Sequence, residues 1–126
     1  MIDNDTTLYW FHQADETFIV GKSGPQQISY HIFYGAHLLT VQDTILGQIY
    51  GNSNGKITVH GLWEAGGDIA IGLEGMGTVE VLDGGVLKVD PLSQSPIPPE
   101  INIGSEAGSF GLLHVDGKGS KVEIHG

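Results

Sequence analysis

The segment IAIGLEGMGTVEVLDGGVLKVD, which runs from Ile69 to Asp90, contains the clearest structural pattern of the chain. It contains three short alternations of apolar and other residues, at 69–71, 79–81 and 87–89, and glycine-rich segments separate them. A helix would not tolerate this much glycine, and a single sheet strand is usually longer. The stretch therefore predicts short strands joined by sharp glycine corners.

The same pattern recurs along the chain at a nearly constant interval. An apolar pair followed by glycine ends at Gly21, Gly47, Gly72 and Gly104, at intervals of 26, 25 and 32 residues. The long last interval contains PLSQSPIPPE (91–100), where we expect a loop because proline cannot donate to a strand ladder. A second glycine follows each anchor after 12 to 14 residues, and these second corner glycines are Gly35, Gly61, Gly84 (or the adjacent Gly85) and Gly117.

A period near 25 residues with three strands per unit predicts a β-solenoid, because each coil buries its apolar residues only against its neighbours. We expect an all-β, right-handed parallel β-helix of about four coils. The coils would span 16–41, 42–67, 68–99 with a loop at 91–99, and 100–126, and residues 1–15 would form a cap or a partial coil. A left-handed hexapeptide solenoid needs an aliphatic residue every six positions, which is not seen. A β-sandwich or barrel would explain the strand density but not the matched units.

Composition limits the possible partners and compartments. The 126 residues carry 15 acidic and 5 basic side chains, for a formal net charge of −10, so a nucleic-acid partner is not expected. There is no cysteine, which excludes disulfides and thiolate metal sites. The sequence has no apolar run of the roughly 18 residues that a membrane span needs, and its first residues do not resemble a signal peptide.

The sequence contains no known catalytic or metal-binding motif. GKSG (21–24) lacks the earlier glycine of a phosphate loop, and the GG segments lack the remaining residues of a calcium nonapeptide. No nucleophile motif occurs, so we expect no catalytic residue, no metal site and no cofactor. The repeat places four residues in one outward column and four at one corner; the column is His31, Thr58, Glu80 and His114, and the corner is His60, Tyr34, Asp83 and Asp116. We expect these histidines to face solvent.

Aromatic residues and the proline-rich loop are the candidate contact surfaces. Tyr9, Trp10 and Phe11 are expected to cap the open end of the stack, because an uncapped solenoid end exposes apolar residues and strand edges. Trp63 either packs over a corner or offers a platform for sugar rings. Pro96 and Pro98 lie in the loop and are further candidate ligand contacts, because loops on rigid scaffolds often bind.

The repeat IxIGxxGxGxVxVxxGGxLxV, taken from residues 69–89, resembles the repeats of bacterial type V autotransporter passenger domains, and INIGSEAGSFGLLHVDGKGSKVEIHG (101–126) resembles them nearly as well. The resemblance covers roughly 16–126. It implies a right-handed β-helix on the outer surface of a Gram-negative bacterium, with no particular ligand. Such passengers are longer and carry a membrane barrel that this chain lacks, so we expect a piece of a larger exported protein.

The predicted function is therefore non-enzymatic. The chain would serve cell-surface adhesion, autoaggregation or a structural stalk, and its partners would be other copies of itself or a host surface or glycan. The alternative is a carbohydrate-binding or polysaccharide-cleaving β-helix of the lyase or tailspike type, which a groove lined by Trp63 and acidic residues would favour. End-to-end assembly through an exposed final coil is a third possibility.

Overall fold

The computed structural model of the chain describes residues 2, 4–21, 26–48, 53–90 and 99–125. All regular structure in this part of the chain is β, and none of it contains a helix long and apolar enough to cross a membrane. The strands are β1 (Thr6–Leu8), β2 (Phe11–Ala14), β3 (Phe18–Val20), β4 (Ile28–Ile32), β5 (His37–Thr40), β6 (Thr44–Leu46), β7 (Asn54–Val59), β8 (Leu62–Ala65), β9 (Ile69–Ile71), β10 (Met76–Leu82), β11 (Val86–Val89), β12 (Ile101–Ile103), β13 (Phe110–Asp116) and β14 (Lys121–Ile124).

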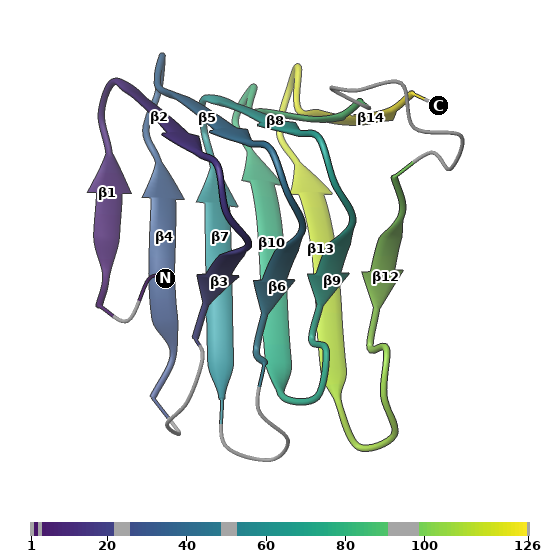
Figure 1. Cartoon of the computed structure of the whole chain (residues 1–126). Helices are drawn as coiled ribbons and strands as arrows, with labels where there is room; N and C mark the ends of the chain where they lie inside the picture. The colour runs from purple at the N-terminus through teal and green to yellow at the C-terminus, as the bar shows by residue number, and fades with distance from the viewer. Residues whose placement is uncertain (1, 3, 22–25, 49–52, 91–98, 126) are drawn as a thin grey trace.

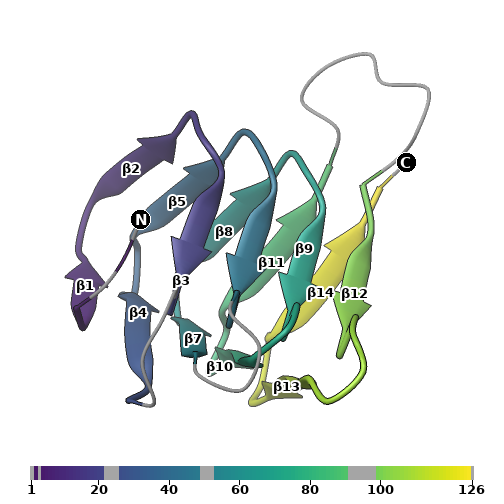
Figure 2. The ribbon, with the colours of Figure 1, turned by 60° about the horizontal axis from the view of Figure 1, so that its bottom comes forward.

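The strands form three parallel sheets, and the chain visits the sheets in turn (Figures 1 and 2). The sheet orders are β1-β4-β7-β10-β13, β2-β5-β8-β11-β14 and β3-β6-β9-β12. Each set of three consecutive strands is therefore one coil, and the next coil stacks on it. This arrangement confirms the prediction of an all-β fold with parallel sheets, and it is consistent with a β-helix-like solenoid. The first coil begins earlier than residue 16, because residues 6–14 already form β1 and β2.

The core is a column of aliphatic side chains inside the stack. Along β10 the residues alternate between buried and partly exposed, as the period of two in a strand requires. Val79 and Val81 point inward and are fully buried, and Leu87 and Val89 do the same in β11. The segment GLWEAGG, the poorest match to the repeat, still forms strand β8 and buries Trp63 and Ala65. Tertiary packing therefore compensates for its weak local signal.

The corners that follow β3, β6 and β9 require glycine for two reasons, and the corner that follows β12 for the first of them only. Gly21, Gly47, Gly72 and Gly104 all have positive φ, between 65° and 77°. At Gly72, in addition, a Cβ atom would collide with the carbonyl oxygen of Phe110 in the next coil. The corners at Gly21, Gly47 and Gly72 thus leave no room for a side chain, whereas at Gly104 the nearest atoms are 3.9 Å away and only the positive φ favours glycine.

The register between coils confirms one predicted column and corrects one predicted corner. His31 pairs with Thr58, Thr58 with Glu80, and Glu80 with His114, so these side chains lie in one outward row. The alignment of Asp83 with Asp116 is wrong by one position, because Leu82 is the register partner of Asp116. The corners differ in length, and alignment on their glycines therefore shifts the residues beside them.

Candidate functional site

An unusually short corner in the third coil creates the first candidate site. Residues 33–36 connect β4 to β5 and residues 83–85 connect β10 to β11, but only His60 and Gly61 connect β7 to β8. The short corner lies between two longer ones. A shallow hollow opens there, and it is lined by three corner glycines and by side chains of the next sheet: Gly35, Gly61, Gly84, His37, Leu62 and Val86.

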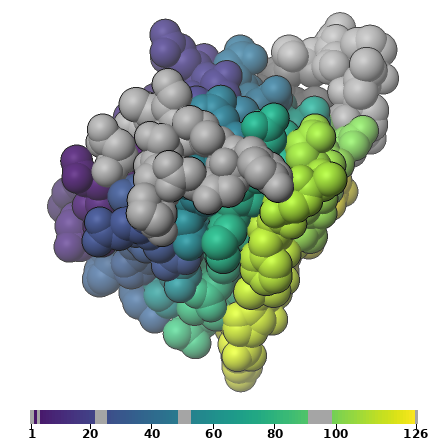
Figure 3. Space-filling view, turned by 90° about the horizontal axis from the view of Figure 1, so that it is seen from below, coloured from purple at the N-terminus to yellow at the C-terminus, as the bar shows by residue number. Residues whose placement is uncertain are grey.

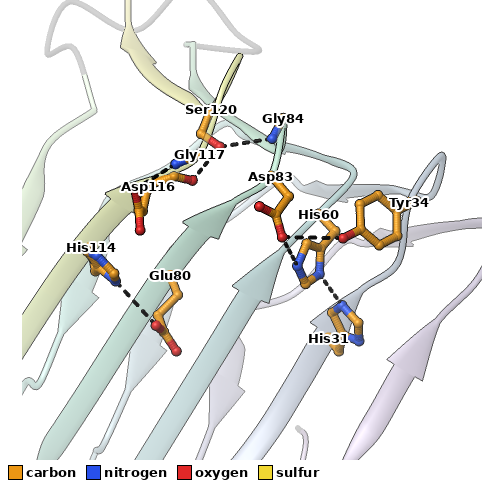
Figure 4. A network of polar contacts seen from close by, with 10 residues as sticks. All are labelled: His31, Tyr34, His60, Glu80, Asp83, Gly84, His114, Asp116, Gly117 and Ser120. Atoms are coloured by element: carbon orange, nitrogen blue, oxygen red, sulfur yellow. Dashed lines mark hydrogen bonds and ion pairs between the residues drawn. The ribbon is translucent and has the colours of Figure 1, made fainter.

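Side chains from the two long corners meet across the short one (Figure 4). The Tyr34 ring stacks on the His60 ring, with centroids 4.5 Å apart and an interplanar angle of 27°. The Tyr34 hydroxyl donates to Asp83 Oδ2 at 3.5 Å, and the same oxygen lies 3.7 Å from His60 Nε2. Asp83 has φ of +50°, the only non-glycine residue with positive φ in the described part of the chain. The three residues form one polar and aromatic cluster.

His31 extends this cluster onto the face of the sheet. Its Nε2 lies 2.5 Å from His60 Nδ1, so the two imidazoles share a hydrogen bond. Burial lowers the pKa of His31, and the neighbouring His60 lowers it further. Both effects disfavour the imidazolium form. Since one nitrogen must accept the shared proton, the pair is stable only while at least one ring is neutral.

Exposed aromatic rings surround the same corner. Tyr9 packs on Phe33 with ring centroids 5.2 Å apart, and Phe33 contacts Tyr34 edge-on at 5.5 Å. Tyr34 is 51% exposed and Tyr9 is 58% exposed. We call Tyr9, Phe33, Tyr34, His60 and Asp83 the aromatic corner. Exposed rings beside a carboxylate suit a ligand with one apolar face and one hydrogen-bonding edge.

A second polar cluster lies on the same sheet, nearer the final coil (Figure 4). Glu80 forms an ion pair with Lys56 in the preceding coil, and it lies 3.3 Å from His114 Nδ1 in the following coil. The hydrogen bond from Lys56 is the largest cause of the lowered pKa of Glu80. The cluster thus links three coils through polar side-chain contacts, and its arrangement suits stacking of the coils. Among the described residues, no group of three His, Cys, Asp or Glu is placed to hold a metal ion.

The predicted ligand residues lie elsewhere. Trp63 is fully buried, and its Nε1 donates to Thr40 Oγ1 at 3.0 Å, so of its two predicted roles, packing or a platform for sugar rings, the platform is wrong. Trp63 is buried because alternate residues of β8 point into the core and Trp63 is one of them. Pro96 and Pro98 lie outside the described residues. Trp10 is 84% exposed and therefore does not cap the stack.

The final coil is the second candidate site, because it leaves core-type side chains open. Ile103, Val115 and Ile124 are 49%, 42% and 57% exposed, although they continue the columns of the fully buried Ile71, Val81 and Val89. Strands β12, β13 and β14 are also the last in their sheets. Figures 1 and 3 show them together at one end of the molecule. We call this surface the open coil end; its inward residues are Ile101, Ile103, Leu113, Val115, Val122 and Ile124.

The first coil presents a different surface. In β2 the register partners of the buried Leu38 and Thr40 are His12 and Ala14, and in β1 the partner of the buried Tyr30 is Thr6. These residues are polar or small, whereas Leu8 in β1, the register partner of the buried Ile32, is apolar and packs against the core. The free edge of β3 is covered in part, since Ile2 forms a parallel bridge with Val20. The two ends of the stack therefore differ in edge protection, and they differ in polarity over β2 and part of β1.

Comparisons with protein-family models, with curated proteins and with solved structures gave no match for this chain. The function must therefore be argued from the geometry of these two surfaces. The sequence predicted these two surfaces only in part. The repeat predicted the position of the final coil, but the aromatic corner depends on corner lengths that the repeat does not determine.

Proposed function

We propose that this chain is a non-enzymatic structural module built for coil-on-coil stacking, whose final coil is covered either by a second copy or by a further coil of the same protein. We further propose that it is a right-handed β-helix from a surface-exposed, autotransporter-like passenger, in which it serves as a stalk or autoaggregation element. The observation that carries the proposal is the final coil, where Ile103, Val115 and Ile124 are exposed, Ile101, Leu113 and Val122 are only partly buried, and the described residues provide no further partner strand.

The energetics of stacking support this function. In the middle of the stack, the same columns are fully buried because a neighbouring coil covers them. Removal of apolar surface from water stabilises a contact by roughly 25 cal/mol per Å². Unpaired edge strands also leave backbone N–H and C=O groups free to pair with another chain. Another copy, or a further coil of a longer chain, would provide both the apolar cover and the strand partners.

The acidic surface and the cysteine-free sequence are compatible with an exported, surface-exposed protein. A net charge of −10 keeps such a module soluble and makes nucleic acid an improbable partner. Adhesion to a host surface or glycan belongs to the same proposal, since a stiff stack would present its corners along its length. Attachment to a membrane would require a part of the protein outside this chain.

The test is light scattering on the purified chain across a wide concentration range, with circular dichroism to monitor the fold. We expect the molar mass to rise with concentration. Val115→Lys places a charge in the open coil end and should keep the chain monomeric, whereas the matched Thr6→Lys in the first coil should not. A monomer at every concentration, or equal effects of the two substitutions, would contradict self-association through this end and would leave a further coil of the same protein as its cover.

The aromatic corner supports a second candidate, namely binding of a neutral saccharide. The exposed faces of Tyr9, Phe33 and Tyr34 would pack against the C–H face of a sugar, and Asp83 would accept from its hydroxyls. Migration in native gels containing soluble starch or a mixed-linkage β-glucan tests this idea. Slower migration of the wild type in one of these gels would support saccharide binding if Tyr34→Ala abolishes the effect. Phe110→Ala, which removes a distant exposed ring, should leave the effect unchanged. Unretarded migration of the wild type in both gels would count against it.

A further inference from the structure

We infer that the aromatic corner binds a small organic cation, with a quaternary ammonium group as its preferred ligand chemistry. Such a ligand belongs to a different class from a neutral saccharide, and its binding does not depend on how the coils stack. A positive charge is attracted to the negative face of an aromatic ring, and this attraction adds to the apolar contact.

The exposed rings of the corner are inclined to one another. The planes of Tyr9 and Phe33 make an angle of 54°, and those of Phe33 and Tyr34 make an angle of 85°. All three side chains are exposed. Rings at such angles do not form one flat platform, whereas a compact group such as trimethylammonium can contact two inclined faces at once. The ring geometry therefore favours a compact ligand.

Asp83 supplies a carboxylate beside the Tyr34 ring (Figure 4). Its Oδ2 accepts a hydrogen bond from the Tyr34 hydroxyl at 3.5 Å, and its side chain is 67% exposed. Among the described residues, its one ion-pair contact is with His60, at 3.7 Å. A neutral imidazole does not compensate the negative charge, so the carboxylate attracts a cation that lies against the neighbouring ring.

The backbone at Asp83 indicates that the side chain does more than form the turn. Its φ of +50° lies in the left-handed region, which aspartate enters at some conformational cost and glycine does not. Glycine occupies the next two positions of the chain but not this one. Both polar contacts of the Asp83 side chain are long, so they offset little of this cost. Residues with such backbone strain cluster at binding and catalytic sites.

The charge of the whole chain favours a cation over a neutral or an anionic ligand. The formal net charge is −10, and all five basic residues are lysines. Two of these lysines are engaged away from the corner, because Lys56 pairs with Glu80 and Lys121 pairs with Glu123. A negative field raises the local concentration of cations at the surface, whereas a neutral ligand gains nothing from it.

The test is an NMR titration of the isotope-labelled chain at pH 8, with choline and separately with dimethylbutanol. Dimethylbutanol is the neutral isostere of choline, in which carbon replaces the ammonium nitrogen. We expect choline to shift the backbone amide signals of Tyr34, Gly35 and Gly84 with millimolar affinity, because the rings are only partly desolvated. Dimethylbutanol should bind several-fold more weakly, since it has the same shape but no charge.

Matched substitutions assign the binding to the corner. Asp83→Asn should weaken choline binding roughly fivefold, because one charge about 4 Å away contributes that much in water. Glu74→Gln removes the same charge beyond the other end of β10 and should change the affinity far less. Tyr34→Ala should weaken binding about two- to fivefold. Asp83→Gly should weaken it as much as Asp83→Asn while the turn stays at least as stable, because glycine adopts positive φ freely.

The expected result is choline binding that exceeds dimethylbutanol binding and falls in the Asp83 and Tyr34 variants. Equal affinities for the two ligands would overturn the preference for a cation but leave the corner as a ligand site. Equal effects of Asp83→Asn and Glu74→Gln would overturn the placement of the cation at this corner. No signal shift with either ligand would overturn the inference, without affecting coil stacking or the gel test for saccharides.

Sedimentation with phosphatidylcholine vesicles distinguishes two sources of the same ligand chemistry. Retention on the vesicles that excess choline abolishes would support the site and indicate a lipid headgroup as its ligand. Binding of free choline without retention on vesicles would support the site and indicate a soluble quaternary ammonium compound.

Discussion

Trp63 and Thr40 form a buried hydrogen bond between adjacent coils: the indole Nε1 donates to Thr40 Oγ1 at 3.0 Å, and both side chains are fully buried. Trp63 lies on β8 and Thr40 on the neighbouring β5. The largest buried side chain of the core thus satisfies its polar atom with a residue of the preceding coil. This bond explains how an indole fits inside a column that otherwise consists mostly of aliphatic residues.

The first prediction follows from this bond. Thr40→Val preserves the shape of the side chain but leaves Trp63 Nε1 without its acceptor. An unsatisfied buried donor costs about 1–3 kcal/mol, so we expect the free energy of unfolding to fall by that amount. Urea denaturation followed by tryptophan fluorescence measures the change.

Thr44 offers a matched control for this substitution. It is also buried and faces inward from a neighbouring strand, but its hydroxyl has no hydrogen-bond partner among the described residues. Thr44→Val should therefore leave stability unchanged or increase it. Equal losses in the two variants would show that the bond from Trp63 contributes nothing.

The second prediction compares the middle of the stack with its open end. Ile71 and Ile103 are register partners, yet Ile71 is fully buried and Ile103 is 49% exposed. Ile71→Ala should cost about 2–5 kcal/mol, the range for a buried aliphatic truncation. Ile103→Ala should cost roughly 1 kcal/mol or less in the monomer. Denaturation at low protein concentration tests this, and a large loss at Ile103 would mean that the final coil is better packed than its exposure indicates.

The repeat predicted the coils well because it reports directly on burial. Alternation of apolar residues fixed the inward faces of β9, β10 and β11, and the corner glycines fixed where each strand ends. The outward row from His31 to His114 followed from the same register. Periodicity determines such features because every coil must satisfy the same stacking geometry.

The aromatic corner could not be predicted, because it arises where the repeat is irregular. The third coil has a two-residue corner, and only this shortening lets Tyr34 and Asp83 meet across it. His31 and His60 belong to different predicted positions, and the sequence gives no sign that their rings approach to 2.5 Å. Side-chain contacts between coils depend on the length of each corner, and the average period of the repeat does not give these individual lengths.

The third prediction separates two requirements for glycine. Gly35 and Gly47 both have positive φ, at 79° and 69°. Among the described residues, no atom lies within 4 Å of the position that a Cβ would take at Gly35, whereas at Gly47 it would collide with the backbone of Met76. Gly35→Ala should cost only the conformational penalty of about 1–2 kcal/mol, and Gly47→Ala clearly more. If the two variants lose similar amounts of unfolding free energy in urea denaturation, the backbone around Gly47 can move apart without an energetic penalty.

The fourth prediction concerns acid sensitivity. Burial, with a smaller contribution from His60, lowers the pKa of His31 below its usual value of 6.5. The unfolded chain therefore binds a proton at His31 more readily than the folded chain does. Stability attributable to this group is complete above pH 6.5 and is lost as the pH falls from there through the folded pKa.

Urea midpoints at pH 7.5 and pH 5.5 test this sign. We expect the wild type to be less stable at pH 5.5, and His31→Gln to lose part of that difference because it removes the titrating group. His125→Gln, which removes an exposed histidine beside Glu123, controls for the loss of one ionisable side chain. Glu80 also has a lowered pKa, but its contribution is lost only below about pH 4.5 and does not enter this interval. If the wild type and His31→Gln lose the same stability between the two pH values, the contact between His31 and His60 does not couple protonation to folding.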